Sequence, residues 1–225
     1  MKVNGENHQV FLRSLILLGI ILAALALATE QGLVQLTLDN DRSYLSYVIL
    51  AVYAGATVHW MFLSYALSGE SSALTLIEQS GVEQDADHTA IGRYFSDARL
   101  VVAHGGQYRG LLDAYSDRIH NRHATGHFIA DTLLKLGLLG TIIGFILMLL
   151  PVAEITNFEA NLMQQMLGKM SLGMAVALYT TLAGLVTSTL LKLQYQVLDT
   201  AAANLVTRVA ELSELQLSGA QQSAP

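Results

Sequence analysis

The stretch Leu136–Ala153 reads LGLLGTIIGFILMLLPVA and carries no charged residue. A second stretch, Met170–Leu191, reads MSLGMAVALYTTLAGLVTSTLL and is equally free of charge. A helix needs roughly 20 mostly apolar residues to cross the hydrocarbon core of a bilayer. Both stretches therefore predict membrane-spanning helices, and the short connection between them predicts an antiparallel hairpin.

Two earlier blocks have the same character. Val10–Ala28 has only Arg13 near its start, and Tyr44–Leu67 has no charge. Over the whole chain 52% of residues are hydrophobic and 13% are charged, whereas about 25% are charged in a typical soluble domain. The sequence therefore predicts an all-α polytopic membrane protein with about four transmembrane helices. The first block also resembles a cleavable signal peptide, but because the chain begins at Met1 we expect a retained helix.

Composition also excludes several classes of function. The chain has no cysteine, which rules out disulfides, thiolate catalysis and cysteine-based zinc sites. Its net charge of −6 provides no basic face for nucleic acid. The sequence contains no arrangement of residues typical of an enzyme active site. We therefore expect that the protein is not an enzyme and that it binds no cofactor and no metal.

Basic residues in the connections predict the orientation, since they favour the cytoplasmic side. The segment 68–132 is the richest in arginine, and Lys135 and Lys192 lie at the matching ends of the third and fourth spans. Both termini and this segment are therefore expected in the cytoplasm, and residues 29–43 and 154–169 outside. The arginines of the segment are Arg93, Arg99, Arg109, Arg118 and Arg122.

We divide the chain into four parts. Residues 1–67 form a peripheral two-helix membrane segment, and residues 68–131 a cytoplasmic helical segment with a break at Gly105-Gly106. Residues 132–193 form a helical hairpin with a periplasmic interface helix at about 156–168, where a capping-box spacing precedes an apolar face. Residues 194–225 form a cytoplasmic helical tail with a disordered end. Within the tail, apolar residues at heptad spacing predict packing against the cytoplasmic helices; they are Leu198, Ala202, Leu205, Val209 and Leu212.

Small residues follow helical spacing on both helices of the hairpin. Gly137, Gly140 and Gly144 lie on the third span, and Gly173 and Gly184 lie on the fourth. Membrane helices associate through close packing, which small residues permit. We therefore expect Gly137, Gly140, Gly173 and Gly184 to pack helices tightly, including between subunits.

Hydroxyl groups accompany these small residues. Hydroxyls inside a membrane either bond to their own backbone or line a polar seam between helices. We therefore expect an uncharged, hydrogen-bonding wall on the hairpin. The candidate residues for this wall are Thr141, Thr181, Thr180, Ala177, Gly144 and Ser188.

The stretch Leu138–Gly144, LLGTIIG, resembles the pore-helix motif of the MotA/TolQ/ExbB proton channel family. Met174–Leu185, MAVALYTTLAGL, resembles the second pore helix of that family. The resemblance covers about 131–193 and implies that the hairpin 132–193 forms a pore. The pore-lining residues that it implies are Thr141, Thr181, Thr180, Ala177, Gly144 and Ser188. Members of the TolQ and ExbB type often carry an acidic residue where this chain has Val176, and four spans also favour the MotA-like branch.

The resemblance implies a homopentamer around two copies of a single-span partner of the MotB/TolR/ExbD type. The partner then supplies the proton-carrying Asp, and the transported ion is the proton. The protein is accordingly expected in a bacterial inner membrane, as a subunit of a motor or energiser driven by the proton-motive force. The residues of the four spans are consistent with a partner that supplies the proton carrier. No Asp or Glu lies inside these spans, so a proton-carrying group has to come from another chain or segment.

Ionisable residues near the spans leave further interpretations open. His59 lies inside the second span, and an intramembrane ionisable residue is a functional hypothesis by default. His120, His123 and His127 share a face that could bind zinc or sense pH, although a solvated face is the simpler interpretation. Asp131 and Lys135 are spaced for an ion pair at the cytoplasmic mouth.

Two other functions compete with the channel. A non-conducting oligomeric scaffold would use the same small-residue faces. A small transporter would favour helices broken at mid-span, whereas Pro151 lies at the end of its span.

Overall fold

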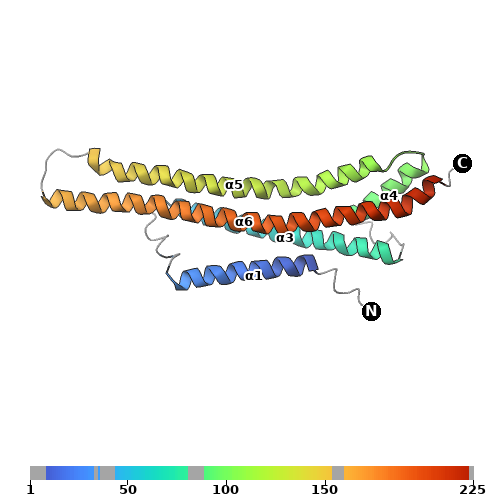
Figure 1. Cartoon of the computed structure of the whole chain (residues 1–225), viewed down its shortest axis with the longest axis horizontal. Coiled ribbons are helices and arrows are strands. Elements are labelled where there is room, and N and C mark those ends of the chain that lie inside the picture. The colour runs from blue at the N-terminus through green and yellow to red at the C-terminus, as the bar shows by residue number, and fades with distance from the viewer. Residues whose placement is uncertain (1–8, 33–34, 36–43, 81–88, 154–159, 223–225) are drawn as a thin grey trace. The chain divides into compact units, whose positions relative to one another are not determined.

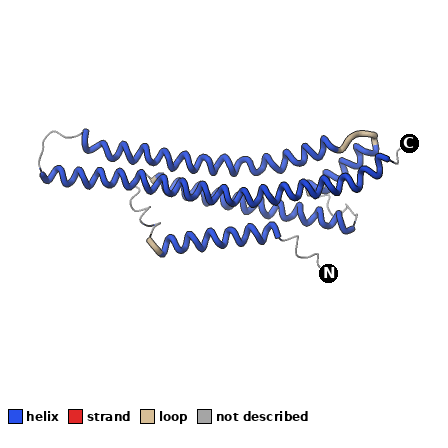
Figure 2. Tube along the Cα trace, viewed as in Figure 1, coloured by secondary structure: helices blue, strands red, loops and turns tan. Residues whose placement is uncertain are grey.

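The computed structural model contains five helices over the residues that it describes (Figures 1 and 2). The described residues are 9–32, 35, 44–80, 89–153 and 160–222, and no strand occurs among them. The helices are α1 (Gln9–Glu30), α3 (Leu45–Ser80), α4 (Ala90–Ala103), α5 (Arg109–Ala153) and α6 (Ala160–Gln222). The all-α prediction is confirmed.

Four of these helices are long and apolar enough to cross a membrane, namely α1, α3, α5 and α6. Each contains one of the four charge-free or nearly charge-free blocks. Three of them continue well past their apolar block, because the sequence places no helix breaker at the point where charged residues begin. The prediction of about four transmembrane helices is thus confirmed, and the third and fourth spans extend beyond the apolar stretch as expected.

The predicted break before the third span is also present. Gly105 adopts a φ of 77°, a left-handed conformation that glycine accepts without strain, and it separates α4 from α5. α4 begins at an N-cap, because the Thr89 hydroxyl accepts a hydrogen bond from the backbone N–H of Gly92. Helix α4 was not predicted as a separate element.

The chain folds into two compact units, which we describe separately. Unit 1 comprises residues 1–17, 59–125 and 194–225, and unit 2 comprises 18–58 and 126–193. Helices α3, α5 and α6 each contribute to both units. Unit 2 holds most of the predicted hairpin together with residues 18–30 of α1 and 45–58 of α3.

Unit 1 confirms the predicted packing of the tail. Leu198, Ala202, Leu205 and Val209 of α6 are buried, and Leu212 is half-buried. Side-chain contacts join this part of α6 to α3, α4 and α5. Hydrogen bonds accompany this contact: the Trp60 indole N–H donates to the Gln194 carbonyl at 2.7 Å. The apolar stripe at heptad spacing is therefore an internal core.

Two boundary predictions are corrected. The interface helix expected at about 156–168 is not separate, because residues 160–168 form the first turns of α6; residues 156–159 lie outside the described residues. The end of the tail was expected to be disordered from Ser218, yet α6 continues to Gln222. Residues 160–168 and 218–222 contain no proline, and a single glycine in each, Gly168 and Gly219, does not end a helix that its neighbours continue.

Candidate functional site

The α5–α6 hairpin of unit 2 is held by backbone contact at the predicted glycines. A Cβ added to Gly184 would lie 2.6 Å from the Gly137 Cα, and one added to Gly173 would lie 2.5 Å from the Met148 backbone nitrogen. A Cβ on Gly144 would lie 2.5 Å from the Ala177 nitrogen. The two helices are this close because no side chain separates them.

This contact accounts for the packing residues of the sequence analysis. Gly137, Gly173 and Gly184 meet backbone of the facing helix, whereas a Cβ on Gly140 would strike the side chain of Thr180. The expectation that these faces pack between subunits is corrected, because the two faces cover each other within one chain.

The hydroxyls of the hairpin make different hydrogen bonds. The Thr181 hydroxyl is shared between the Gly137 carbonyl at 3.1 Å and its own helix at Ala177, at 2.9 Å. The Thr141 hydroxyl donates to the Leu138 carbonyl at 2.5 Å. Both threonines stay partly exposed. A hydroxyl has one hydrogen and two lone pairs, so each of these groups remains able to accept a hydrogen bond.

Thr141 and Thr181 lie on the same edge of the hairpin. At about 100° per residue, Thr141 is rotated by about 40° from Gly137, and Thr181 by about 60° from Gly184. Gly137 and Gly184 touch, and antiparallel helices reverse the sense of rotation, so both threonines turn toward one side. We call this side the threonine edge. By the same rotation about each helix axis, Asp131 and Lys192, which form an ion pair, also lie on this edge.

Apolar side chains surround the two hydroxyls on the threonine edge. These side chains are large and exposed in the single chain. The edge is therefore an exposed apolar surface that contains two hydroxyl groups. The neighbours that share this side are Leu138 (52% exposed), Phe145 (59%), Leu178 (64%) and Leu185 (52%).

The opposite edge is covered. Leu45 of α3 lies against Gly140, and the buried Thr180 shares this side. Thr180 donates to the Val176 carbonyl at 2.8 Å, and the buried Thr187 donates to the Ala183 carbonyl at 2.7 Å. These hydroxyls satisfy their own helix and face other helices of the same chain.

The six residues predicted to line a pore therefore separate into two groups. Thr141 and Thr181 lie on the open edge. The other four are buried in the single chain, namely Thr180, Ala177, Gly144 and Ser188. A pore-lining role for any of them stays a prediction.

The predicted ion pair at the mouth is corrected. Asp131 pairs with Lys192 of α6 at 2.8 Å, rather than with Lys135 one turn along its own helix. The hydrogen bond and positive charge of Lys192 lower the pKa of Asp131, and Lys135 and His127 add smaller effects in the same direction. The Asp131–Lys192 ion pair was not predicted because it depends on how far each helix extends relative to the other. The position of Lys192, at the end of the fourth span that matches the start of the third, was the sequence feature that could have indicated it.

The histidines do not act together. His123 is buried and its Nδ1 lies 2.9 Å from the Asp199 carboxylate, whereas His120 and His59 are exposed. Among the residues that the structure describes, no group of three or more His, Cys, Asp or Glu is placed to hold a metal ion. The shared face thus consists of the exposed His120, the buried His123 paired with Asp199, and the half-buried His127.

The fold and the hairpin define a multi-pass membrane protein whose central feature is a glycine-packed helical pair with an open edge. Residues 108–211 match the model of the MotA/TolQ/ExbB proton channel family. The predicted family is confirmed; it is a family of channels rather than an enzyme class, and its members work with partner proteins in membrane complexes. Comparison with curated proteins and with solved structures gave no match.

Proposed function

We propose that this chain is the proton-channel subunit of a membrane motor or energiser driven by the proton-motive force. The observation that carries the proposal is the threonine edge, an exposed apolar surface with two hydroxyls in the segment that matches the channel family. Such a surface suits a neighbouring transmembrane helix that presents one ionisable group. The transported ion in this proposal is the proton, with no cofactor.

The hydrogen bonds of the two threonines favour this role. Each hydroxyl donates its hydrogen to a carbonyl, so the lone pairs of its oxygen remain able to accept a hydrogen bond from a partner helix. A protonated carboxylic acid can donate to such an oxygen, whereas a carboxylate cannot. The threonine edge therefore stabilises the neutral form of a partner Asp within the membrane, where a charge is costly.

The arrangement proposed around this edge comprises five copies of the chain and two copies of a single-span, Asp-bearing partner. Repetition of the subunit would present equivalent threonines around the partner helices. Proton loading and release then move the partner from one threonine edge to the next. In this proposal the membrane is the bacterial inner membrane, with both termini and residues 68–132 in the cytoplasm.

Proton uptake into liposomes that contain the chain with its partner tests the proposal. Thr141→Val and Thr181→Val keep the side-chain shape and remove the hydroxyl. We expect uptake to fall about tenfold or more in each variant, because a polar contact to the proton carrier is lost. Thr187→Val is the matched control, since this hydroxyl is buried on the opposite edge, and it should conduct like the parent.

Unchanged uptake in both Thr141→Val and Thr181→Val would contradict the channel proposal. The bond from Thr181 to the Gly137 carbonyl would then serve only to join the two helices. In that case the chain is better described as a non-conducting oligomeric scaffold.

A further inference from the structure

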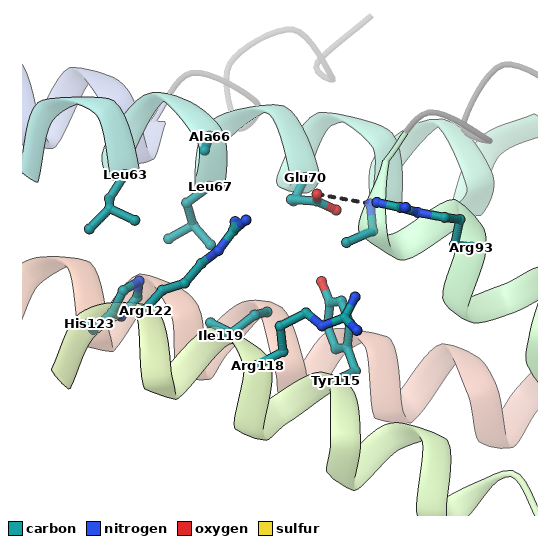
Figure 3. Close-up of a pocket in the computed structure, with 11 residues that line it drawn as sticks. Leu63, Ala66, Leu67, Glu70, Arg93, Tyr115, Arg118, Ile119, Arg122 and His123 are labelled. Atoms are coloured by element: carbon teal, nitrogen blue, oxygen red, sulfur yellow. Dashed lines mark hydrogen bonds between the residues drawn. The ribbon is translucent and has the colours of Figure 1, made fainter. Parts of the chain in front are cut away.

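A pocket of about 130 Å³ lies in unit 1, apart from the hairpin. Its walls come from α3, the start of α4 and the first half of α5 (Figure 3). One wall is apolar, with Leu63, Ala66 and Leu67 of α3 and Ile119 of α5. The remaining lining is rich in positive charge, with Arg93, Arg118 and Arg122.

The arginines of this pocket have no acidic partner among the residues that the structure describes. The ion pairs of unit 1 instead join His123 to Asp199 and Arg208 to Glu78. All three pocket arginines are exposed, and Figure 3 shows Arg118 and Arg122 extending from α5 toward α3. Three guanidinium groups around one small pocket repel one another unless an anion joins them.

One carboxylate, Glu70, also lines the pocket, and each of its oxygens already accepts a backbone hydrogen bond. Its two oxygens accept hydrogen bonds from the backbone N–H groups of Ala90 and Ile91, each at 3.0 Å, at the N-terminus of α4. This contact fixes the start of α4 and thereby places Arg93, one turn further along. Glu70 thus organises the pocket but leaves an excess of positive charge in it.

A second observation points to a ligand. Tyr115 is only 6% exposed, and its hydroxyl is buried without a hydrogen-bond partner. Figure 3 shows this hydroxyl directed from α5 toward Glu70 across the pocket. Burial raises the pKa of Tyr115, and the Glu70 charge adds to the effect, so the group stays a neutral O–H donor. A buried donor without a partner is costly, and an acceptor oxygen in the pocket would remove that cost.

The surroundings show where such an anion would come from. The charge-free part of α3 ends at Gly69, and the exposed aromatic side chains of Phe62 and Tyr65 precede this point, as at a membrane boundary. The Ser14 hydroxyl bonds to Ser64 at 3.3 Å, which places Arg13 of α1 close to this level. The pocket therefore lies where the charge-free part of α3 gives way to charged residues.

We propose that this pocket binds a phosphate group, presented by the headgroup of an acidic phospholipid. Arg118 and Arg122 would hold the phosphate oxygens through charged, paired N–H donors, which guanidinium groups supply in a fixed geometry. Tyr115 would donate its free hydrogen, and Leu63 and Leu67 would contact the first part of the acyl chains. The bound lipid would join α3, α4 and α5 at the membrane surface.

Native mass spectrometry of the full chain in detergent tests this site. The chain is titrated separately with phosphatidylglycerol, phosphatidylcholine and inorganic phosphate. We expect one tightly bound phosphatidylglycerol per chain, with weaker binding of phosphatidylcholine and no displacement by millimolar phosphate. Arg118→Gln and Arg122→Gln should each weaken the binding about tenfold, and Tyr115→Phe about fivefold. Arg122→Lys keeps the charge but loses the paired donors, so its loss should be intermediate.

Arg109→Gln is the matched control, because it removes the same charge from the same helix outside the pocket. It should bind phosphatidylglycerol like the parent. Equal loss in Arg109→Gln and Arg122→Gln would overturn the site in favour of general charge attraction. Displacement of phosphatidylglycerol by inorganic phosphate would overturn the lipid source in favour of a soluble phosphate. Circular dichroism checks that each variant is folded. The lipid-binding result does not depend on whether the threonine variants alter conduction.

Discussion

Helices α5 and α6 pack against their neighbours in two different ways along their length. In unit 2 they meet through glycine, and a Cβ on Gly184 would lie 2.6 Å from the Gly137 Cα. In unit 1 the same helices contribute large side chains, such as Tyr115 of α5 and Leu198 of α6, and polar pairs such as His123 with Asp199. One pair of helices thus uses backbone contact in one unit and side-chain burial in the other.

The difference fits the predicted topology, in which α5 and α6 lie in lipid along the hairpin and continue into water outside it. Lipid tails are as apolar as leucine, so burying leucine between membrane helices gains little, and close backbone approach stabilises the pair instead. In water, burying a leucine side chain is favourable by roughly 1.5–3 kcal/mol. The two units should therefore respond in opposite ways to side-chain size: unit 2 to enlargement and unit 1 to truncation.

The largest expected effect comes from enlarging a hairpin glycine. Gly184→Leu places a side chain against the backbone of Leu133 and Gly137, which cannot move as a flexible side chain does. Overpacking of a core usually costs about 1–3 kcal/mol and occasionally more. Because the neighbours here are backbone atoms of the facing helix, we expect this variant to exceed that range and to lose more than the roughly 2–5 kcal/mol of a core truncation. Unfolding by SDS in mixed micelles, followed by circular dichroism, measures the loss.

Gly168→Leu is the control for that experiment, since a Cβ there meets nothing within 4 Å. It enlarges the same helix and should unfold like the parent. Equal loss in both variants would show that helix propensity, rather than contact with α5, governs the hairpin.

Truncation in unit 1 should have the next largest effect. Leu198→Ala removes a fully buried side chain, which costs about 2–5 kcal/mol because a cavity remains. Thermal unfolding followed by circular dichroism measures this change. Leu215→Ala, at a position 79% exposed on the same helix, should leave the stability within about 0.5 kcal/mol of the parent. A stable Leu198→Ala would break the contrast between the two units.

The smallest effect concerns the Asp131–Lys192 ion pair on the threonine edge. Because Lys192 lowers the pKa of Asp131, the pair stabilises the fold above the ordinary value of 3.8 and loses that contribution as the pH falls through the lowered pKa. Lys192→Gln should raise the pKa of Asp131 toward 3.8. An NMR titration of the aspartate carboxyl carbons, assigned with Asp131→Asn, measures the change. Lys135→Gln should produce a smaller rise, and the reverse order would indicate the pairing originally predicted along α5.

Much of the fold follows from local pattern. The charge-free stretches predict the spans because any backbone group in lipid has to be paired within a helix. The break at Gly105-Gly106 and the buried tail stripe from Leu198 to Val209 were also predictable, since a turn residue and heptad spacing are local features. The boundaries predicted at residues 168 and 218 were wrong, because polarity changes there without any residue that stops a helix.

For the candidate site, sequence determined the chemical character and tertiary structure decided the placement. Spacing alone identified Thr141, Thr181 and the hairpin glycines as one set of small and hydroxyl-bearing residues. The structure separated Thr180 from Thr181, although they are neighbours, because rotation about a helix axis puts adjacent residues on different sides. It also paired Asp131 with Lys192 and gathered Arg93, Arg118 and Arg122 around Glu70. Those contacts join residues far apart in the chain, and their relative depth and rotation depend on how whole helices pack.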